Sequence, residues 1–368
     1  MRTVVVGAGI AGAAAGYELA RNGVDVTLVD PRTPGRATSA GAGIICPWSS
    51  RVEDPDWYRF ARAGAEHYEE LRAALAADGE TELGYRRVGS LRLTTEDEAD
   101  DVLRYVSGRA AESPLAGDVE LVDARRAREL FPPLGHEGPA VHIPGAARLD
   151  GRLVRDAMCR AAVKHGARVV EGAAEVVADG PGGAARGVRV DGAFIGADSV
   201  VVAAGAWAPA LLEPLGVTLR IAPQRGQIVH LRLPGTDTTD WPVVLPMSSH
   251  YLLAFDDSRV VVGATREEGS GFDHRVTAAG LKEVLDEALA VAPGLADATH
   301  VETRIGFRPV GPDIRPLLGA VPKVPGLVVV NGLGASGLTM GPYAGSLAAR
   351  LARGADPGTD LAAYDPLR

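Results

Sequence analysis

The sequence of 368 residues contains only two cysteines, Cys46 and Cys159. Two thiols cannot form the disulfide framework of a small secreted domain or a four-cysteine zinc site. The eight histidines show neither an H-x-x-x-H spacing nor any clustering. The sequence therefore predicts no metal site and no dependence of the fold on disulfides.

Positive charge and long apolar runs are also scarce. Lysine and arginine number 38 against 47 acidic residues, and the net charge of −9 argues against non-specific binding to nucleic acid or to an anionic membrane. No stretch offers 18 consecutive apolar residues, so no membrane span is predicted. With 46% hydrophobic and 23% charged residues, we expect a globular, cytoplasmic protein of two domains.

The first 30 residues are predicted to form one βαβ unit, with strands over 3–6 and 24–29 around a helix over 13–21. The turn 7–12 reads Gly-Ala-Gly-Ile-Ala-Gly, and Asp30 ends the second strand. In this context the glycines allow a pyrophosphate to approach a helix N-terminus, and the acid accepts hydrogen bonds from a ribose. The alternative is a glycine turn that only packs the helix against the strand. An acid at this position disfavours a 2′-phosphate, which leaves NAD or FAD.

The rest of the chain alternates helical and strand patterns. Helices are predicted over 57–77, 96–111, 151–165, 278–292 and 342–353, with Pro342 at the first position of the last one. Strands are predicted over 85–88 and 90–93 as a pair, and over 168–171, 174–177, 194–203, 227–233, 259–262 and 327–331. This order predicts a nucleotide-binding α/β domain in separated pieces, with a strand-rich second domain inserted between them.

Six segments in this order resemble the D-amino-acid oxidase family of flavoproteins, which includes glycine oxidase, sarcosine oxidase and D-amino-acid dehydrogenase. They are residues 4–12, Thr-Ser-Ala-Gly-Ala-Gly at 38–43, Val-Val-Ala-Ala-Gly-Ala-Trp at 201–207, Pro-Gln-Arg-Gly-Gln at 223–227, Gly-Phe-Arg-Pro at 306–309 with Pro312-Asp313, and 334–342. The first segment is common to many flavoproteins, whereas the ordered set is specific to this family.

The resemblance implies a glycine-oxidase-like α/β plus mixed-β fold with bound FAD. A Rossmann-type FAD-binding domain is expected over 1–84, 145–222 and 302–368, and an antiparallel-sheet substrate-binding domain over 85–144 and 223–301. The implied reaction is oxidation of the C–N bond of an amino acid or related carboxylated amine. A hydride leaves Cα for flavin N5, and the imine is then hydrolysed.

The resemblance also implies roles for individual residues. Arg308 matches the family arginine that binds a substrate carboxylate, and Tyr251 matches a tyrosine near the substrate. Thr38 and Ser39 are expected near the flavin ring and pyrophosphate, and Val176 near the adenine. The full set of expected cofactor-binding residues is Gly7, Gly9, Ile10, Ala11, Gly12, Asp30, Pro31, Arg32, Thr38, Ser39, Ala42, Gly43, Ile44, Val176, Ala204, Gly205, Trp207, Arg308, Gly334, Ala335, Ser336, Gly337, Leu338 and Thr339.

Three positions depart from the family pattern. Ala335 stands where glycine oxidase has a second arginine. No cysteine follows Cys159, whereas sarcosine oxidases attach flavin through a late cysteine, so FAD is predicted to be non-covalent. Val261 stands where those oxidases carry a lysine that activates oxygen, which favours a quinone or dye over oxygen as electron acceptor.

Other interpretations remain open at this point. A 2-hydroxy-acid dehydrogenase of the same fold would also need a carboxylate-binding arginine, and a nucleotide-binding scaffold would carry out no reaction. Arg308 could instead form a salt bridge with Asp313 that only stabilises a turn. The sequence does not define the substrate, its stereochemistry or the oligomeric state.

Overall fold

The computed structural model describes residues 1–180 and 182–368. Its first layer is a six-stranded sheet in the order β19-β20-β13-β1-β2-β9. Neighbouring strands are parallel except for β19 and β20, which are antiparallel. The strands are β1 (Arg2–Val6), β2 (Asp25–Asp30), β9 (Arg168–Glu171), β13 (Ser199–Val202), β19 (Leu317–Ala320) and β20 (Leu327–Asn331).

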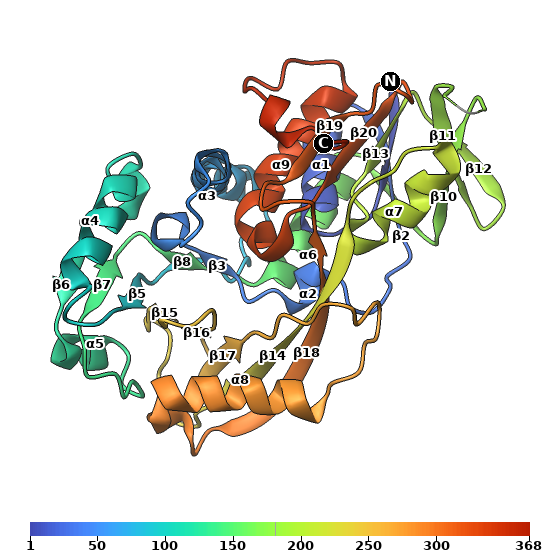
Figure 1. Cartoon of the computed structure of the whole chain (residues 1–368). Helices are drawn as coiled ribbons and strands as arrows, with labels where there is room; N and C mark the ends of the chain where they lie inside the picture. The colour runs from blue at the N-terminus through green and yellow to red at the C-terminus, as the bar shows by residue number, and fades with distance from the viewer. Residues whose placement is uncertain (181) are drawn as a thin grey trace.

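Both faces of this sheet are covered, which explains why its strands are almost continuously apolar. Val5 faces a helical layer, whereas Val4 and Val6 face a small antiparallel sheet on the other side. In Figure 1 the helices lie to the left of the six-stranded sheet and the small sheet to its right. The helical layer contains α1 (Ile10–Arg21), α3 (Pro55–Ala77), α6 (Gly151–Lys164) and α9 (Gly337–Ala352), and the small sheet contains β10 (Ala174–Ala178), β11 (Ala185–Val190) and β12 (Ala193–Gly196).

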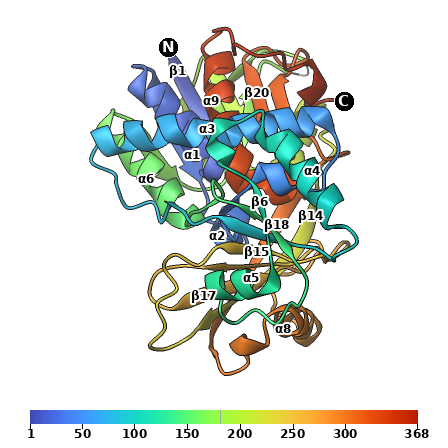
Figure 2. The same ribbon diagram turned by 90° about the vertical axis from the view of Figure 1, so that its left-hand side faces the viewer.

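A second large sheet has eight strands in the order β18-β14-β17-β16-β15-β5-β7-β6. Helix α8 (Ala278–Val291) covers one face of it, at the foot of the molecule in Figure 2, through Val284 and Ala288. The strands are β5 (Ser90–Leu93), β6 (Glu120–Val122), β7 (Ala140–Ile143), β14 (Ala222–Arg232), β15 (Val243–Leu245), β16 (Tyr251–Ala254), β17 (Arg259–Gly263) and β18 (Thr299–Val310).

Shorter elements connect the two large sheets and complete the outer layers. Strands β3 and β4 both pair with β8 in a second small sheet, the fourth sheet of the structure. These elements are β3 (Ile44–Ile45), β4 (Arg86–Arg87), β8 (Ala147–Arg148), α2 (Ala37–Ala40), α4 (Ala99–Ala110), α5 (Ala124–Leu130) and α7 (Ala208–Leu212).

Two predicted strand assignments were wrong because the chain changes sheets inside them. The segment 194–203 is split into β12 and β13, and the break falls at Asp198, whose carboxylate accepts a hydrogen bond from the backbone N–H of Arg2 at 2.8 Å. Strands β4 and β5 do not pair with each other, since β4 pairs with β8 and β5 pairs with β7 and β15. Apolar alternation identifies strands but does not identify their partners.

The predicted start of the last helix was also wrong. Helix α9 begins at Gly337, so Pro342 lies inside it. Proline has no N–H to donate to the carbonyl of Leu338 four residues earlier. The hydroxyl of Tyr68, on α3, donates a hydrogen bond to that carbonyl instead, which satisfies the acceptor that the proline leaves free.

One predicted domain limit falls inside a strand of the eight-stranded sheet. Strand β18 crosses the limit predicted at 301/302 and pairs with β14 over its length. The structure thus places Arg308 within a long strand, two residues before its end. The limits themselves stay a prediction.

Candidate active site

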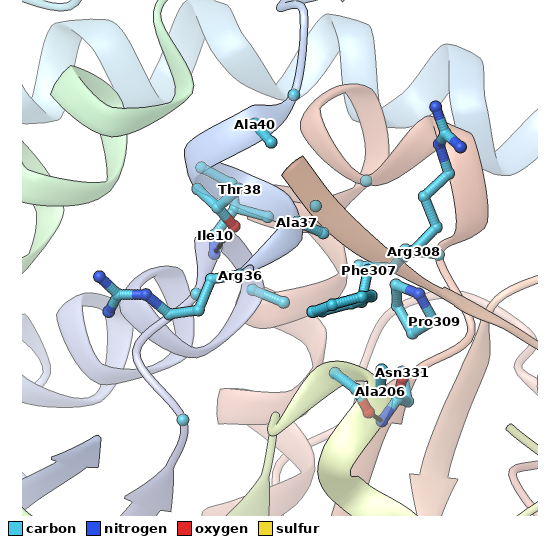
Figure 3. Close-up of a pocket in the computed structure, with 18 of the residues that line it drawn as sticks. Ile10, Arg36, Ala37, Thr38, Ala40, Ala206, Phe307, Arg308, Pro309 and Asn331 are labelled. Carbon is cyan, nitrogen blue, oxygen red and sulfur yellow. Dashed lines mark hydrogen bonds between the residues drawn. The ribbon is translucent and has the colours of Figure 1, made fainter. Parts of the chain in front are cut away.

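A cavity of about 560 Å³ lies between the carboxyl ends of the parallel strands and the eight-stranded sheet. Ligands bind at this edge of open α/β sheets, where the strand order reverses, here beside β1 and β13. Figure 3 shows Thr38 and Ile10 on one side of the cavity and Phe307, Arg308 and Pro309 on the other. The side chains of Arg36 and Arg308 extend away from each other at the two ends of this group.

In the glycine turn that leads into α1, close backbone contacts require Gly7 and Gly12, whereas Gly9 has free space beside it. Gly7 has a φ of +96°, and a Cβ added there would lie 2.5 Å from the carbonyl oxygen of Ala203. A Cβ on Gly12 would lie 1.8 Å from the Gly7 carbonyl oxygen. A Cβ on Gly9 would meet only Thr38 Oγ1, at 3.4 Å. Gly9 therefore leaves room for a pyrophosphate at the positive end of α1.

Asp30, at the end of β2, is only 7% exposed and accepts three hydrogen bonds. Its Oδ2 accepts from the N–H of Ala8 at 2.6 Å, and its Oδ1 accepts from the N–H of Arg32 at 2.7 Å and from Arg36 Nη1 at 3.0 Å. A carboxylate has about four lone-pair positions, so one remains for a ribose hydroxyl. The glycine turn, Asp30 and the N-terminus of α1 fit the adenosine and pyrophosphate of FAD.

Arg308 occupies the other end of the cavity, on β18. Its Nη1 donates to the carbonyl oxygen of Thr265 at 2.9 Å and to Gln224 Oε1 at 3.3 Å. Among the described residues, no carboxylate pairs with this guanidinium. Burial lowers its pKa, and the positive charge of Arg266 lowers it further. A partly buried cation without an acidic partner favours binding of an anion.

The alternative pairing of Arg308 with Asp313 is not formed in the structure. Asp313 instead pairs with Arg368 at 2.7 Å and lies 3.5 Å from Arg315. These contacts stabilise the turn after β18 without Arg308, whose Nη2 and Nε remain available to bind a carboxylate.

Tyr251 of β16 and Arg266 of the loop after β17 also line the cavity near Arg308. Burial raises the pKa of Tyr251, although Arg308 and Arg266 oppose this, so the phenol keeps its proton and can donate a hydrogen bond. Arg266 is exposed and donates to Ser249 Oγ at 2.8 Å. No carboxylate pairs with Arg266 within the described chain. This end of the cavity therefore presents two arginines and one phenol.

The structure brings most of the predicted site residues to the cavity. Gly7, Gly9, Ile10, Ala11, Asp30, Pro31, Thr38, Ala42, Gly43, Ile44, Ala204, Gly205, Trp207, Tyr251, Arg308, Gly334, Ala335, Gly337, Leu338 and Thr339 line it. Gly12, Arg32, Ser39, Val176 and Ser336 do not. Gly12 packs α1 on its strand, Arg32 pairs with Glu171 at 3.1 Å, and Ala173 and Ala174 line the wall where Val176 was expected.

Sequence analysis missed Arg36, Arg266, Phe307 and Asn331, which also line the cavity. A signal existed for Phe307, since it lies inside the recognised segment 306–309. Arg36 and Arg266 lie in loops among many other arginines, and no local pattern separates them. Cys46 does not line the cavity and lies 3.1 and 3.3 Å from the hydroxyls of Ser49 and Ser90.

Within residues 1–180 and 182–368, no helix is long and apolar enough to cross a membrane. In the same part of the chain, no group of three or more His, Cys, Asp or Glu side chains is placed to hold a metal ion.

Comparison with known proteins identifies the family. The family model described as DAO, FAD dependent oxidoreductase, matches residues 2–351. The crystal structure of an iminodiacetate oxidase from Chelativorans sp. BNC1 is 51% identical, covers 99% of both chains and superposes with a TM-score of 0.96. The structure of glycine oxidase from Geobacillus kaustophilus is 30% identical, covers 100% of this chain and 99% of its own, and has a TM-score of 0.86. The oxidoreductase YurR of Bacillus subtilis (strain 168), which is uncharacterized, is 46% identical over 99% of this chain and 98% of its own.

These similarities confirm four predictions from the sequence: the family, the α/β plus mixed-β fold, the FAD cofactor and oxidation of the C–N bond of an amino acid. Together with the cavity that fits a dinucleotide, they show that the chain belongs to the DAO family of FAD-dependent oxidoreductases.

Proposed function

We propose that this enzyme oxidises the C–N bond of a secondary amine that carries two carboxylates, with iminodiacetate as the model substrate. The observation that carries the proposal is the presence of two arginines, Arg308 and Arg266, in one cavity without an acidic partner in the described chain. Acidic residues outnumber basic ones in this protein, and unpaired arginines on a cavity wall are therefore unusual.

Arg308 is the less exposed of the two cations. Its Nη1 is held by Thr265 and Gln224, while Nη2 and Nε can form two parallel hydrogen bonds to one carboxylate. This carboxylate would be the one next to the carbon that is oxidised, as expected from the family resemblance.

Arg266 supports binding of a second carboxylate. It is close enough to lower the pKa of both Tyr251 and Arg308, and it is exposed at the cavity wall. Ala335 leaves no arginine in the last glycine loop, where glycine oxidase has its second one, so Arg266 supplies the second charge from a different element. The relative named iminodiacetate oxidase has a substrate with two carboxylates, which supports the same assignment.

The reaction requires orientation of the substrate more than it requires an acid or base. The Cα–H bond breaks with loss of a hydride, the nitrogen lone pair forms a C=N bond, and water hydrolyses the imine to an aldehyde acid and an amine. When bound, FAD supplies the two-electron acceptor. Arg308 and Arg266 hold the carboxylates, and the neutral phenol of Tyr251 donates a hydrogen bond to the substrate.

The test compares substrates with one and two carboxylates. We measure kcat/KM for iminodiacetate and for sarcosine in the wild-type enzyme, in Arg266→Ala and in Arg275→Ala. Arg275 is a matched control, because it lies in the same loop but pairs with Asp273 at 2.9 Å and does not line the cavity. Loss of a charge-assisted contact of about 1.5–3 kcal/mol predicts a decrease of roughly 10- to 150-fold for iminodiacetate in Arg266→Ala alone.

Equal decreases for both substrates in Arg266→Ala, or no decrease for iminodiacetate, would contradict the assignment of the second carboxylate. The electron acceptor, oxygen or a quinone, and the cytoplasmic location stay predictions. Stopped-flow reoxidation of the reduced enzyme by oxygen, compared with the turnover rate, decides the acceptor.

A further inference from the structure

The segment Pro-Gln-Arg-Gly-Gln at 223–227 was recognised in the sequence, but no role was assigned to it. The structure shows what four of its five residues contact. The segment lies in β14, where alternate residues face opposite sides of the sheet. Gln224 and Gly226 lie on the same side of the sheet as Arg308, and Gly226 lines the cavity. Gln224 accepts a hydrogen bond from Arg308, and a Cβ added to Gly226 would lie 2.6 to 2.7 Å from three atoms of the Arg308 guanidinium.

On the opposite side, Arg225 is 7% exposed and binds the loop between β17 and α8, residues 264–277. Its Nη2 and Nε donate to Glu267 Oε2 at 2.6 and 3.1 Å, and its Nη1 lies 3.0 Å from Asp273 Oδ2. The backbones of Arg225 and Glu267 also exchange two hydrogen bonds, at 3.0 and 2.9 Å. Arg225 therefore holds two points of this loop.

The second oxygen of Glu267 is also fully engaged. Its Oε1 accepts from Gln227 Nε2 and from Thr265 Oγ1, both at 2.7 Å. Burial would raise the pKa of Glu267, but the hydrogen bonds from Arg225, Gln227 and Thr265 outweigh it and lower the pKa. Glu267 thus stays ionised, and the side chains of Arg225, Gln227 and Thr265 hold its carboxylate in place.

Arg308 lies in β18 and is held by Gln224 as well as by Thr265, whereas Arg266 belongs to the loop and depends on its neighbour Glu267. Arg266 precedes it directly, and consecutive residues of an extended segment point to opposite sides. When Glu267 is held against Arg225, Arg266 is directed to the cavity. The carbonyl oxygen of Thr265, one residue further back, accepts the hydrogen bond that holds Arg308.

We infer that Arg225 and Glu267 are positioning residues that set the enzyme's specificity for a second carboxylate, by holding Arg266 in the cavity. The inference rests on the proposed function. It predicts that Glu267 affects binding of a dicarboxylated amine through Arg266, and that it has little effect once Arg266 is absent.

A matched ion pair far from the cavity separates positioning from general stability. Glu80 is 7% exposed and accepts hydrogen bonds from Arg160 Nε at 2.8 Å and Lys164 Nζ at 2.7 Å, which joins the end of α3 to α6. None of these three residues lines the cavity. Loss of the Glu80 carboxylate should cost stability without changing the choice of substrate.

The experiment is a double-mutant cycle with Glu267→Gln and Arg266→Ala, with Glu80→Gln as the control and Arg225→Lys as a conservative variant. For iminodiacetate we expect Glu267→Gln to raise KM about tenfold with a smaller change in kcat, and to change kcat/KM for sarcosine less than about twofold. In the Arg266→Ala background, Glu267→Gln should change kcat/KM by less than about twofold. Arg225→Lys should have an intermediate effect on kcat/KM for iminodiacetate, because lysine keeps the positive charge but lacks the several N–H donors of the planar guanidinium.

Hydrogen exchange of the holoenzyme gives a readout that does not depend on turnover. Exchange of the amides at 265–277 should be faster in Glu267→Gln than in the wild type, and unchanged in Glu80→Gln. Additive effects of the two substitutions, or exchange in this loop at the wild-type rate, would overturn the inference. If the wild type prefers sarcosine to iminodiacetate, the proposed substrate is wrong, whereas the exchange measurement still decides whether Glu267 holds the loop.

Discussion

Replacement of Gly226 by alanine tests whether the position of Arg308 matters for catalysis. The added methyl would lie 2.6 Å from Arg308 Nη2 and 2.7 Å from Cζ and Nη1. Gly226 has no left-handed backbone conformation, so alanine is allowed at this point of β14. The contact is relieved when the guanidinium, the end of a flexible side chain, moves away.

The size of this movement follows from ordinary contact distances. Relief from 2.7 Å to about 3.5 Å requires a shift of about 0.8 Å. Such a shift breaks the match between Arg308 and a substrate carboxylate, and a misplacement of about 1 Å can cost roughly 100-fold in rate. We expect Gly226→Ala to lower kcat/KM about 10- to 100-fold for every carboxylated substrate, with small change in thermal stability.

The assay is steady-state kinetics together with the flavin absorption spectrum and the melting temperature. Gly196→Ala is the matched control, since Gly196 also lies in a strand and its added Cβ would meet Arg2 Nη1 at an ordinary 3.7 Å. An unchanged kcat/KM in Gly226→Ala would refute the placement of Arg308 as the carboxylate-binding group. Loss of FAD from this variant would show that Gly226 acts on the cofactor instead.

Three other predictions follow from single groups. Asp30→Asn should weaken FAD binding roughly 10- to 150-fold in a fluorescence titration of the apoprotein, because a charge-assisted acceptor worth about 1.5–3 kcal/mol is lost; unchanged affinity would contradict the role of Asp30. Acid precipitation should release all flavin to the supernatant, because neither cysteine lines the cavity; flavin in the pellet would mean covalent attachment. Burial, with Arg304 nearby, lowers the pKa of His230 from 6.5 to about 3, so His230 gains a proton in the unfolded chain before it does in the folded protein as the pH falls below 6.5. Between pH 7 and pH 5, urea titrations should show that the free energy of unfolding decreases by about 2 kcal/mol more in the wild type than in His230→Gln. Equal decreases in the two proteins would contradict the lowered pKa.

The cofactor end of the site could be predicted because its chemistry is local. The turn 7–12 and Asp30 lie within one βαβ unit, and their spacing alone brings them together. Thr38 was recognised from a segment that follows directly, and its Oγ1 accepts a hydrogen bond from the N–H of Ile10 at 2.9 Å. Even here, Arg36 was missed, since nothing local shows that it turns back to Asp30.

The substrate end could be predicted only in part because it is assembled from distant segments. Arg308, Tyr251 and Arg266 come from β18, β16 and the loop after β17, and the sheet order that joins these elements is not visible in apolar alternation. The resemblance identified Arg308 and Tyr251. Arg266 emerged only when the structure showed which arginines have acidic partners.

The most direct test of the central claim is anaerobic reduction of the bound flavin. The enzyme is mixed without oxygen with iminodiacetate, sarcosine, glycine or malate, and the loss of visible flavin absorbance is followed. Iminodiacetate should bleach the flavin at least about tenfold faster than either monocarboxylated amine, and malate, which has two carboxylates but no nitrogen, should leave it oxidised. Bleaching by malate and by none of the amines would show that the enzyme is a hydroxy-acid dehydrogenase and contradict the account.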